Sequence, residues 1–392
     1  MRFFSSAYIK ELLLLFKITA EKEKELIQLR RRLHMNPELG FSEYETSNLI
    51  AEYLEKSGVE VTRGVAKTGV VGLIRGKGDG KTLLLRADID ALPMQETAEC
   101  EYASLRNGAM HACGHDVHTA VLLGAAGILS ETRGNFPGNI KLVFQPAEES
   151  IGGALPMIEA GVMENPRVDG AAAFHISELP LGSIGIKKGC VTASPDHFHI
   201  RITGRGGHGA SPESCVNPVE IGSRIATRLN NIRLDMPSVV SICAFQSGTG
   251  ENIIPDTALL MGTARALDKA TRQRLYEMIL SISDEVATSL GGKAEVDYRF
   301  LYPPGENDAD MTDMFIKAAE AVIGRENIIY QEKSQMVGDD FSYFAERVPS
   351  CYVQLGGAIR PLHSSDFDVD ERCISIGAEI MSHFALKFLG SI

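Results

Sequence analysis

The residues best suited to do chemistry lie in one short stretch, His111–His118. It holds three histidines, one cysteine and one aspartate, in a chain with only ten histidines and seven cysteines in all. Imidazole and thiolate groups are the ligands that borderline-soft metals such as Zn²⁺ prefer, and a nearby carboxylate can bind the ion or orient a ligand. The alternative is a helix start that happens to be rich in histidine. The stretch predicts a metal site with more candidate ligands than one site needs.

Further candidates follow along the chain. Glu148 and Glu149 stand directly after the apolar run 139–144. One of two adjacent carboxylates can bind a metal ion while the other acts as a general base, although solvated surface charge is the alternative. His175 ends another apolar run, and His363 lies far away in the sequence. For each histidine the alternative is a core or capping role, so the prediction depends on the whole set.

The apolar pattern predicts the elements that position these groups. Short apolar runs at 82–85, 139–144 and 171–174 are typical of buried strands, and helical patterns separate them. This alternation predicts an α/β fold, with a mostly parallel sheet covered by helices. Ligands bind such sheets at the carboxyl ends of the strands, which is where Asp88, Asp90 and the candidates above fall.

The pattern changes near residue 188. A strand at 197–203 shows period-two alternation, and the expected order continues with a helix at 218–229, strands at 239–245 and 258–266, a helix at 270–290 and a strand at 294–300. This β-α-β-β-α-β order is the split motif of ferredoxin-like α+β domains. We therefore expect residues 188–303 to form an inserted domain, between the two parts (1–187 and 304–392) of the α/β domain. The second part begins with a helix at 311–323 and ends with one at 374–389.

Bulk properties limit the class of protein. A length of 392 residues favours two domains, and a formal net charge of −12 argues against a nucleic-acid partner. The apolar run 12–16 is bracketed by charges and is too short for a signal peptide or a membrane span. Seven scattered cysteines are typical of reduced thiols. We expect a cytoplasmic protein without a membrane partner, or one with a leader before about Thr19.

Five motifs together resemble the amidohydrolase branch of the aminoacylase/glutamate-carboxypeptidase metallopeptidases. This branch includes hippurate hydrolases, N-acyl-amino-acid deacetylases and indoleacetyl-amino-acid hydrolases. The motifs are RADIDALP at 86–93, HACGHDVH at 111–118, QPAEE at 145–149, GRGGHGASP at 204–212 and HSSDF at 363–367. The resemblance spans about 25–389. One departure is Asp339 at the start of Asp-Asp-Phe, where relatives commonly carry glutamate, and this bears on substrate preference rather than on metal binding.

The resemblance implies a zinc-peptidase-like catalytic domain with two divalent metal ions per subunit. The ions would be Zn²⁺ or Mn²⁺, with Co²⁺ and Ni²⁺ as alternatives. Cys113 would bridge both ions, Glu149 and His363 would complete one site, and His115 and His175 would complete the other.

The resemblance also implies roles outside the ligand set. Glu148 would be the general base on a metal-activated water, and Asp90 would orient a ligand. His208, in relatives supplied by the partner subunit through a lid and dimerisation domain, would reach the oxyanion. Asn252 and Arg265 would bind the substrate's carboxylate, although Arg265 could equally be a surface residue. The implied assembly is a homodimer or a higher homo-oligomer.

The first hypothesis is a metal-dependent amidohydrolase that cleaves the amide bond of small N-acyl amino acids, such as N-acetyl or N-benzoyl derivatives. A carboxypeptidase or dipeptidase on the same scaffold is the alternative within enzymes. A structural or sensory metal-binding protein is the alternative in another class. It would leave Glu148 and His208 superfluous, because closed structural sites need no adjacent base.

Overall fold

The computed structural model describes residues 17–391, so the apolar run 12–16 lies outside the described residues. The chain forms two compact units. The first comprises the chain through Gly189, Glu306–Glu332 and the residues from Tyr343 onward, and the second comprises Cys190–Gly305 and Lys333–Ser342. The inserted unit begins and ends two residues later than the expected 188–303, and Lys333–Ser342 groups with it. The backbone of this segment is tied there, because Ala193 N donates to Val337 O at 2.9 Å.

The first unit is built on an eight-stranded sheet in the order β1-β2-β4-β3-β5-β16-β6-β15. Strands β4, β3, β5 and β16 run parallel to one another, whereas β1, β2 and β6 each have an antiparallel neighbour. The bounds are β1 Glu60–Val65, β2 Gly69–Arg75, β3 Thr82–Asp88, β4 Asn139–Gln145, β5 Gly170–Ser177, β6 Ile184–Ile186, β15 Ile328–Tyr330 and β16 Ser350–Gly356. The predicted α/β class with a mostly parallel sheet is confirmed.

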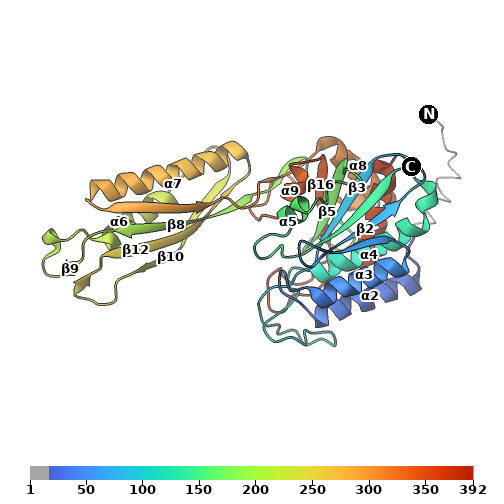
Figure 1. The fold of residues 1–392 in the computed structure, drawn as a ribbon, viewed down its shortest axis with the longest axis horizontal. Helices are drawn as coiled ribbons and strands as arrows, with labels where there is room; N and C mark the ends of the chain where they lie inside the picture. Colours follow the sequence, from blue (N-terminus) through green and yellow to red (C-terminus); the bar gives the residue numbers. More distant parts are fainter. Residues whose placement is uncertain (1–16, 392) are drawn as a thin grey trace. The chain divides into compact units, whose positions relative to one another are not determined.

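The sheet is buried by helices that pack on one another. The long helices are α2 Ala20–Met35, α3 Tyr44–Lys56, α4 His115–Glu131, α8 Ala309–Ile323 and α10 Cys373–Phe388. Helix α4 contacts β3 and packs against α2, α3 and α10 (Figure 1). Every residue of β3 is buried, which explains its continuous apolar run, since central parallel strands are covered on both faces.

The second unit is a four-stranded antiparallel sheet in the order β10-β12-β8-β13. Its main elements are β8 Ser194–Thr203, α6 Pro218–Asn230, β10 Ser238–Ser247, β12 Thr257–Ala266, α7 Lys269–Ser289 and β13 Lys293–Arg299. Phe198, Ile200 and Ile202 of β8 are fully buried in its core, whereas Arg201 is exposed. The period-two alternation therefore places the apolar side chains toward the helices.

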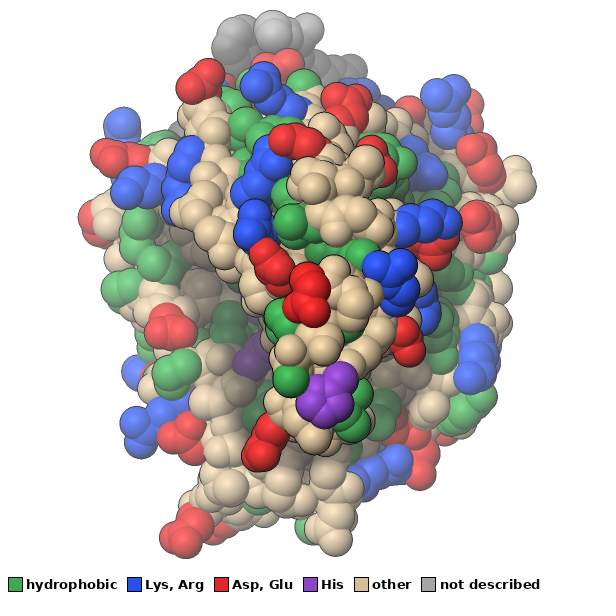
Figure 2. All heavy atoms as spheres, turned by 90° about the vertical axis from the view of Figure 1, so that its left-hand side faces the viewer, with side chains coloured by type: hydrophobic (Ala, Val, Ile, Leu, Met, Phe, Trp, Pro, Cys, Tyr) green, Lys and Arg blue, Asp and Glu red, His purple; other side chains and the backbone are tan. Residues whose placement is uncertain are grey.

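Short elements complete the described chain. They are α5 Ala154–Glu159, β7 Gly189–Thr192, β9 Gly207–His208, β11 Ile253–Ile254, β14 Gly305–Asn307 and α9 Ser342–Ala345. Strands β9 and β11 pair as a two-stranded ribbon in the second unit. Within residues 17–391, no helix combines the length and apolar character needed to cross a membrane. Acidic and basic side chains are interspersed over the face shown in Figure 2.

Candidate metal centre

The carboxyl ends of neighbouring parallel strands bring the candidate ligands of the first unit together. Asp88 ends β3, Glu149 follows β4 and His175 lies near the end of β5. Cys113 and His115 stand at the start of α4, and His363 lies in the loop after β16. We call Cys113, His115, Glu149, His175 and His363 the Cys113 cluster.

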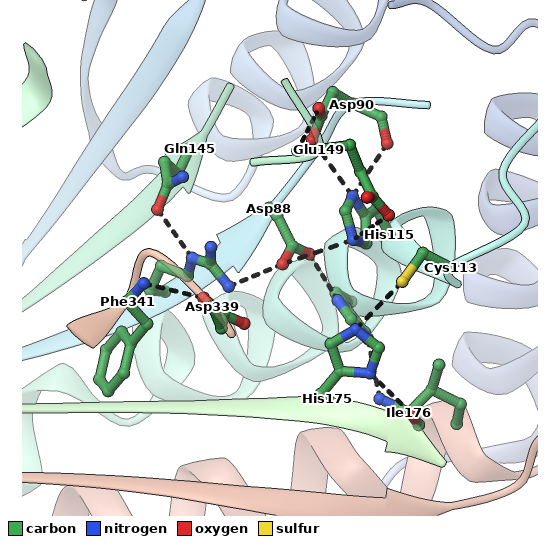
Figure 3. Close-up of polar contacts among 12 residues, drawn as sticks. Asp88, Asp90, Cys113, His115, Gln145, Glu149, His175, Ile176, Asp339 and Phe341 are labelled. Carbon is green, nitrogen blue, oxygen red and sulfur yellow. Dashed lines mark hydrogen bonds and ion pairs between the residues drawn. The ribbon is translucent and has the colours of Figure 1, made fainter. Parts of the chain in front are cut away.

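The cluster consists of two groups that share the thiol. Ligand atoms of Cys113, His115 and His175 lie within 4.8 Å of one another, and so do those of Cys113, Glu149 and His363. Cys113 Sγ is 3.2 Å from His175 Nε2 and 3.3 Å from His363 Nε2. Figure 3 shows the Cys113 sulfur pointing toward the His175 ring. The structure thus brings together the five residues that the sequence analysis proposed as ligands.

Hydrogen bonds fix how two of the histidines face the thiol. His115 Nδ1 lies 2.9 Å from the backbone oxygen of Asp90, and His175 Nδ1 lies 2.7 Å from that of Ile176. A carbonyl oxygen accepts only, so each Nδ1 carries the proton and donates it. The lone pair of each neutral ring is therefore on Nε2. Such a contact behind a ligand is how proteins orient metal-binding histidines.

Two buried atoms of the cluster indicate that its residues fit a metal ion. His115 Nε2 and Glu149 Oε1 are buried and make no hydrogen bond, although His363 Nε2 lies 3.3 Å from that glutamate oxygen. Buried polar atoms are normally satisfied, so two such atoms in one cluster indicate a missing partner. A thiol, three imidazoles and a carboxylate are a donor set for borderline metals such as Zn²⁺.

Charge and burial shape the cluster. Burial opposes the charge of Glu149, but the contacts with His363 and His115 lower its pKa to about 2. Burial lowers the pKa of His175 to about 4, so that ring is neutral near pH 7. Burial raises the pKa of Cys113 well above its ordinary value, and Glu149 adds to the shift. The thiol is therefore protonated near pH 7, and a bound cation would displace this proton.

Glu148 and Asp90 lie beside the cluster. A carboxylate oxygen of Glu148 lies within 4.8 Å of ligand atoms of His115 and Glu149. Asp90 Oδ2 accepts the backbone N–H of Glu149 at 3.0 Å, and its Oδ1 lies 3.2 Å from His115 Nδ1. Asp90 therefore contacts two members of the cluster, as Figure 3 shows for His115.

Gly114 explains how Cys113 and His115 can both face the cluster. Its φ is +79°, a conformation that residues with a side chain rarely adopt, and a Cβ atom there would lie 2.4 Å from Ile176 Cγ2. Glycine therefore permits both the turn and the close approach of α4 to β5. The loop that carries His363 is joined to the same turn, because His363 N donates to Ala112 O at 2.8 Å.

Three candidates of the second unit are arranged differently. His208 is exposed in β9, where it pairs with Ile253 of β11, and Asn252 O accepts the N–H of Gly209 at 2.8 Å. His208 Nδ1 accepts the N–H of Ala210 at 3.0 Å, so the proton of the neutral ring is on Nε2.

Arg265 is not brought next to His208 and Asn252 within this unit. It lies near the end of β12, where it pairs with Pro195 and Val239, and its Nη1 donates to Met336 O at 3.0 Å. β11 adjoins the other end of β12, which begins at Thr257. At the rise of a strand, Thr257 and Arg265 are roughly 26 Å apart.

A comparison with known protein families matches residues 84–387 to "Peptidase family M20/M25/M40". The chain belongs to this family. It is therefore a hydrolase of amide or peptide bonds, and the resemblance proposed from the motifs is confirmed. The family match covers both units, so it does not rest on the metal cluster alone.

The relatives of this M20 chain are similar over nearly its whole length. It is 42% identical over 384 residues to thermostable carboxypeptidase 2 of Saccharolobus solfataricus, covering 94% of this chain and 96% of the relative. It is 36% identical to N-acetylcysteine deacetylase of Bacillus subtilis, with 94% and 97% covered. The crystal structure of the Bacillus subtilis YXEP protein, a dinuclear metal binding peptidase from the M20 family, superposes with a TM-score of 0.85 at 34% identity, covering 95% of this chain and 100% of that one.

Sequence reasoning placed Asp88 at the strand end and gave His118 a supporting role, but it did not show that the two contact each other behind the cluster. Asp88 is fully buried, forms an ion pair of 2.6 Å with Arg86, and lies 2.5 Å from His118 Nδ1. His118 Nε2 accepts the N–H of Ile176 at 2.9 Å, so Nδ1 donates to Asp88 and no lone pair is left for a metal ion. The only signal was that Asp88 and Asp90 share one strand end.

Proposed function

We propose that the chain is a metal-dependent amidohydrolase that cleaves N-acyl amino acids, including N-acetyl and N-benzoyl derivatives. The observation that carries the proposal is the Cys113 cluster, two ligand groups with one shared thiol and a second glutamate beside them. A structural metal site needs no such spare carboxylate. The deacetylase among the relatives supports an N-acyl amino acid as the substrate.

We assign the Cys113 cluster to two divalent cations, Zn²⁺ or Mn²⁺. Cys113 would contact both, Glu149 and His363 would hold one, and His115 and His175 would hold the other. When bound, two such ions polarise a carbonyl group and acidify a water molecule between them. The dinuclear metal binding relative supports the number of ions.

The chain's own residues supply the proton transfer. Glu148 would accept the proton of the attacking water and donate it to the leaving amine, a step typical of a positioned carboxylate. Asp90 would act by positioning, because it contacts both His115 and the backbone of Glu149. Glu149 would not serve as the base, because its carboxylate is assigned to a metal ion.

We further propose that the second unit is a lid that completes the site in a homodimer. His208 Nε2–H would donate to the oxyanion, and Asn252 and Arg265 would bind the substrate's carboxylate. Asn252 precedes β11, before the Thr257 end of β12, whereas Arg265 lies near the other end of β12, and this separation supports contributions from two different copies of the chain. Strand β10 supports the dimer, because it is a sheet edge with no charged side chain and such edges pair readily.

A carboxypeptidase on the same scaffold is the second candidate, and the 42% identical thermostable carboxypeptidase supports it. The two differ in what lies on the acyl side of the bond. A panel of N-acetyl, N-benzoyl and dipeptide substrates separates the two candidates, because the kcat/KM values show which acyl group the enzyme prefers. Preference for dipeptides by more than tenfold would replace the first candidate with the second.

The decisive variant is Glu148→Gln. We expect it to bind Mn²⁺ with wild-type stoichiometry and to lose roughly 10³-fold or more in kcat, since the amide cannot accept the proton. Metal analysis and steady-state kinetics on the same sample check both halves. Unchanged turnover would refute the assigned base. Wild-type enzyme that hydrolyses no amide in the panel would favour a non-catalytic metal-binding protein.

A further inference from the structure

The turn that carries Glu148 and Glu149 has an unusual backbone. Ala147 adopts φ = +56°, in the left-handed region that residues with a side chain rarely occupy, and it is fully buried. Its carbonyl oxygen accepts the N–H of Gly152 at 3.0 Å. Such a conformation persists only where surrounding contacts determine it.

One such contact is a buried carboxylate from a distant part of the chain. Glu43 Oε1 accepts the N–H of Ala147 at 2.9 Å, and its Oε2 accepts the hydroxyl of Thr68 at 2.6 Å. Glu43 is fully buried and stands immediately before α3, more than a hundred residues before the turn. Both carboxylate oxygens are therefore used, and one of them holds the Pro146–Ala147 peptide, one residue before Glu148.

A second carboxylate binds the backbone directly after Glu148. Asp90 Oδ2 accepts the N–H of Glu149 at 3.0 Å. Glu43 thus anchors the Pro146–Ala147 peptide, one peptide before Glu148, and Asp90 anchors the Glu148–Glu149 peptide directly after it. A charged acceptor makes such hydrogen bonds stronger than neutral ones. These two contacts hold the backbone from which the Glu148 side chain projects.

We infer that Glu43 is a positioning residue, which holds Ala147 in its left-handed conformation and thereby aims Glu148 and Glu149 at the Cys113 cluster. The inference rests on the proposed roles of these two glutamates. Glu43 would not touch the substrate and acts only through the turn. Its loss should therefore change the rate and the metal affinity together, because Glu148 and Glu149 share one backbone segment.

The test compares Glu43→Ala with Glu43→Gln. In Glu43→Ala we expect kcat for an N-acetyl amino acid to fall roughly 10- to 100-fold with KM within about threefold, as expected for a small misplacement of a catalytic group. Calorimetric titration with Mn²⁺ should show one site weakened about 10- to 100-fold. Glu43→Gln should restore most of both values, because its amide oxygen can still accept the N–H of Ala147.

A double variant tests the conformational part. Glycine adopts positive φ without a side-chain clash. Ala147→Gly should therefore recover part of the kcat lost in Glu43→Ala, while the same change in the wild type brings no gain. If Glu43→Ala does not fold, Glu43→Asp replaces it, since its shorter side chain withdraws the carboxylate from Ala147 while keeping the charge.

Glu38→Ala is the matched control for lost stability. Glu38 is another buried carboxylate before α3, and it accepts the N–H groups of Glu45 and Thr46 at 3.2 and 2.8 Å instead of contacting the turn. We expect it to lower the Tm without changing kcat per folded molecule. Equal losses of kcat in Glu38→Ala and Glu43→Ala, or wild-type Mn²⁺ affinity in Glu43→Ala, would overturn the inference. Full turnover by Glu148→Gln would refute the base instead, while the Mn²⁺ titration still tests Glu43.

Discussion

The two units hold their candidate site residues in opposite ways. In the first unit, His115 is 1% exposed and Cys113 is 8% exposed, and buried acceptors hold the His115 ring. In the second unit, His208 is exposed and its ring nitrogen has one backbone contact. In the first arrangement, contacts within one chain already hold the metal-binding side chains in place. The second leaves a donor open to solvent, as expected for a group that acts only when another surface meets it.

The largest effect expected from the comparison of the two units concerns His208, the exposed histidine of the second unit. His208→Ala should lower kcat roughly 10²- to 10³-fold, the usual loss when one oxyanion donor is removed. Bound Mn²⁺ should remain at the wild-type level, because His208 is not part of the Cys113 cluster. Kinetics and metal analysis of the purified variant check this. Loss of metal in His208→Ala would contradict the assignment of metal binding to residues of the first unit alone.

Mixing two inactive variants shows whether His208 acts across a dimer. If it does, co-refolded Glu148→Gln and His208→Ala chains form heterodimers with one intact site, and random pairing returns about a quarter of wild-type activity. If His208 acts within its own chain, every site of the mixture lacks one group and activity stays at the level of the variants.

The next effect concerns the buried charges behind the cluster. Arg30 is fully buried, and its Nε lies 2.7 Å from Asp116 Oδ2, next to His115. Burial opposes the charge of Arg30, but Asp116 and Glu371 raise its pKa above the ordinary value. Arg30→Met should lower the free energy of unfolding by about 3–5 kcal/mol, because it leaves the buried Asp116 without its guanidinium partner and with only the His34 contact at 2.7 Å. Urea unfolding at pH 7 measures the loss.

The second unit supplies the control for that variant. Arg228 and Glu285 form an ion pair of 3.0 Å, but their side chains are 44% and 63% exposed. Arg228→Met should therefore cost less than ~1 kcal/mol, as exposed pairs do. Similar losses of unfolding free energy for the two variants would mean that burial does not determine how much each ion pair contributes to stability.

The smallest effect is the pH dependence of the first unit's stability. Burial lowers the pKa of His383 in α10 from 6.5 to about 4, and Lys387 adds to the shift. The unfolded chain then takes up the proton at a higher pH than the folded chain. Stability from this residue is present above pH 6.5 and is lost as pH falls toward 4, by at most about 3 kcal/mol.

His383→Leu should remove that part of the pH dependence. Unfolding measured between pH 5 and pH 8 should show a shallower slope for the variant below pH 6.5. Above pH 7 the difference between the two proteins should be constant, which serves as the internal control. Parallel curves across the whole range would refute the assignment.

Local patterns predicted most of the scaffold. The apolar runs that became β3, β4 and β5 were visible because central parallel strands are buried on both faces. The alternation in β8 was visible because that strand has one buried and one open face. By contrast, β1 is largely exposed, and β9 and β11 have two residues each, so none of them has a periodic signal.

Residue types and their order indicated the candidate ligands, and the resemblance of the motifs selected five of them. Cysteine, histidine and glutamate at strand ends predict a metal site before any coordinates exist, because their side chains have few other reasons to gather there. Only the tertiary structure decided that His118 has no free lone pair, that Arg265 is remote from His208, and that Glu43 holds the turn before Glu148. Each of these depends on a contact between segments far apart in the chain. A periodic sequence pattern records which face of an element is buried, but not which distant atom it meets.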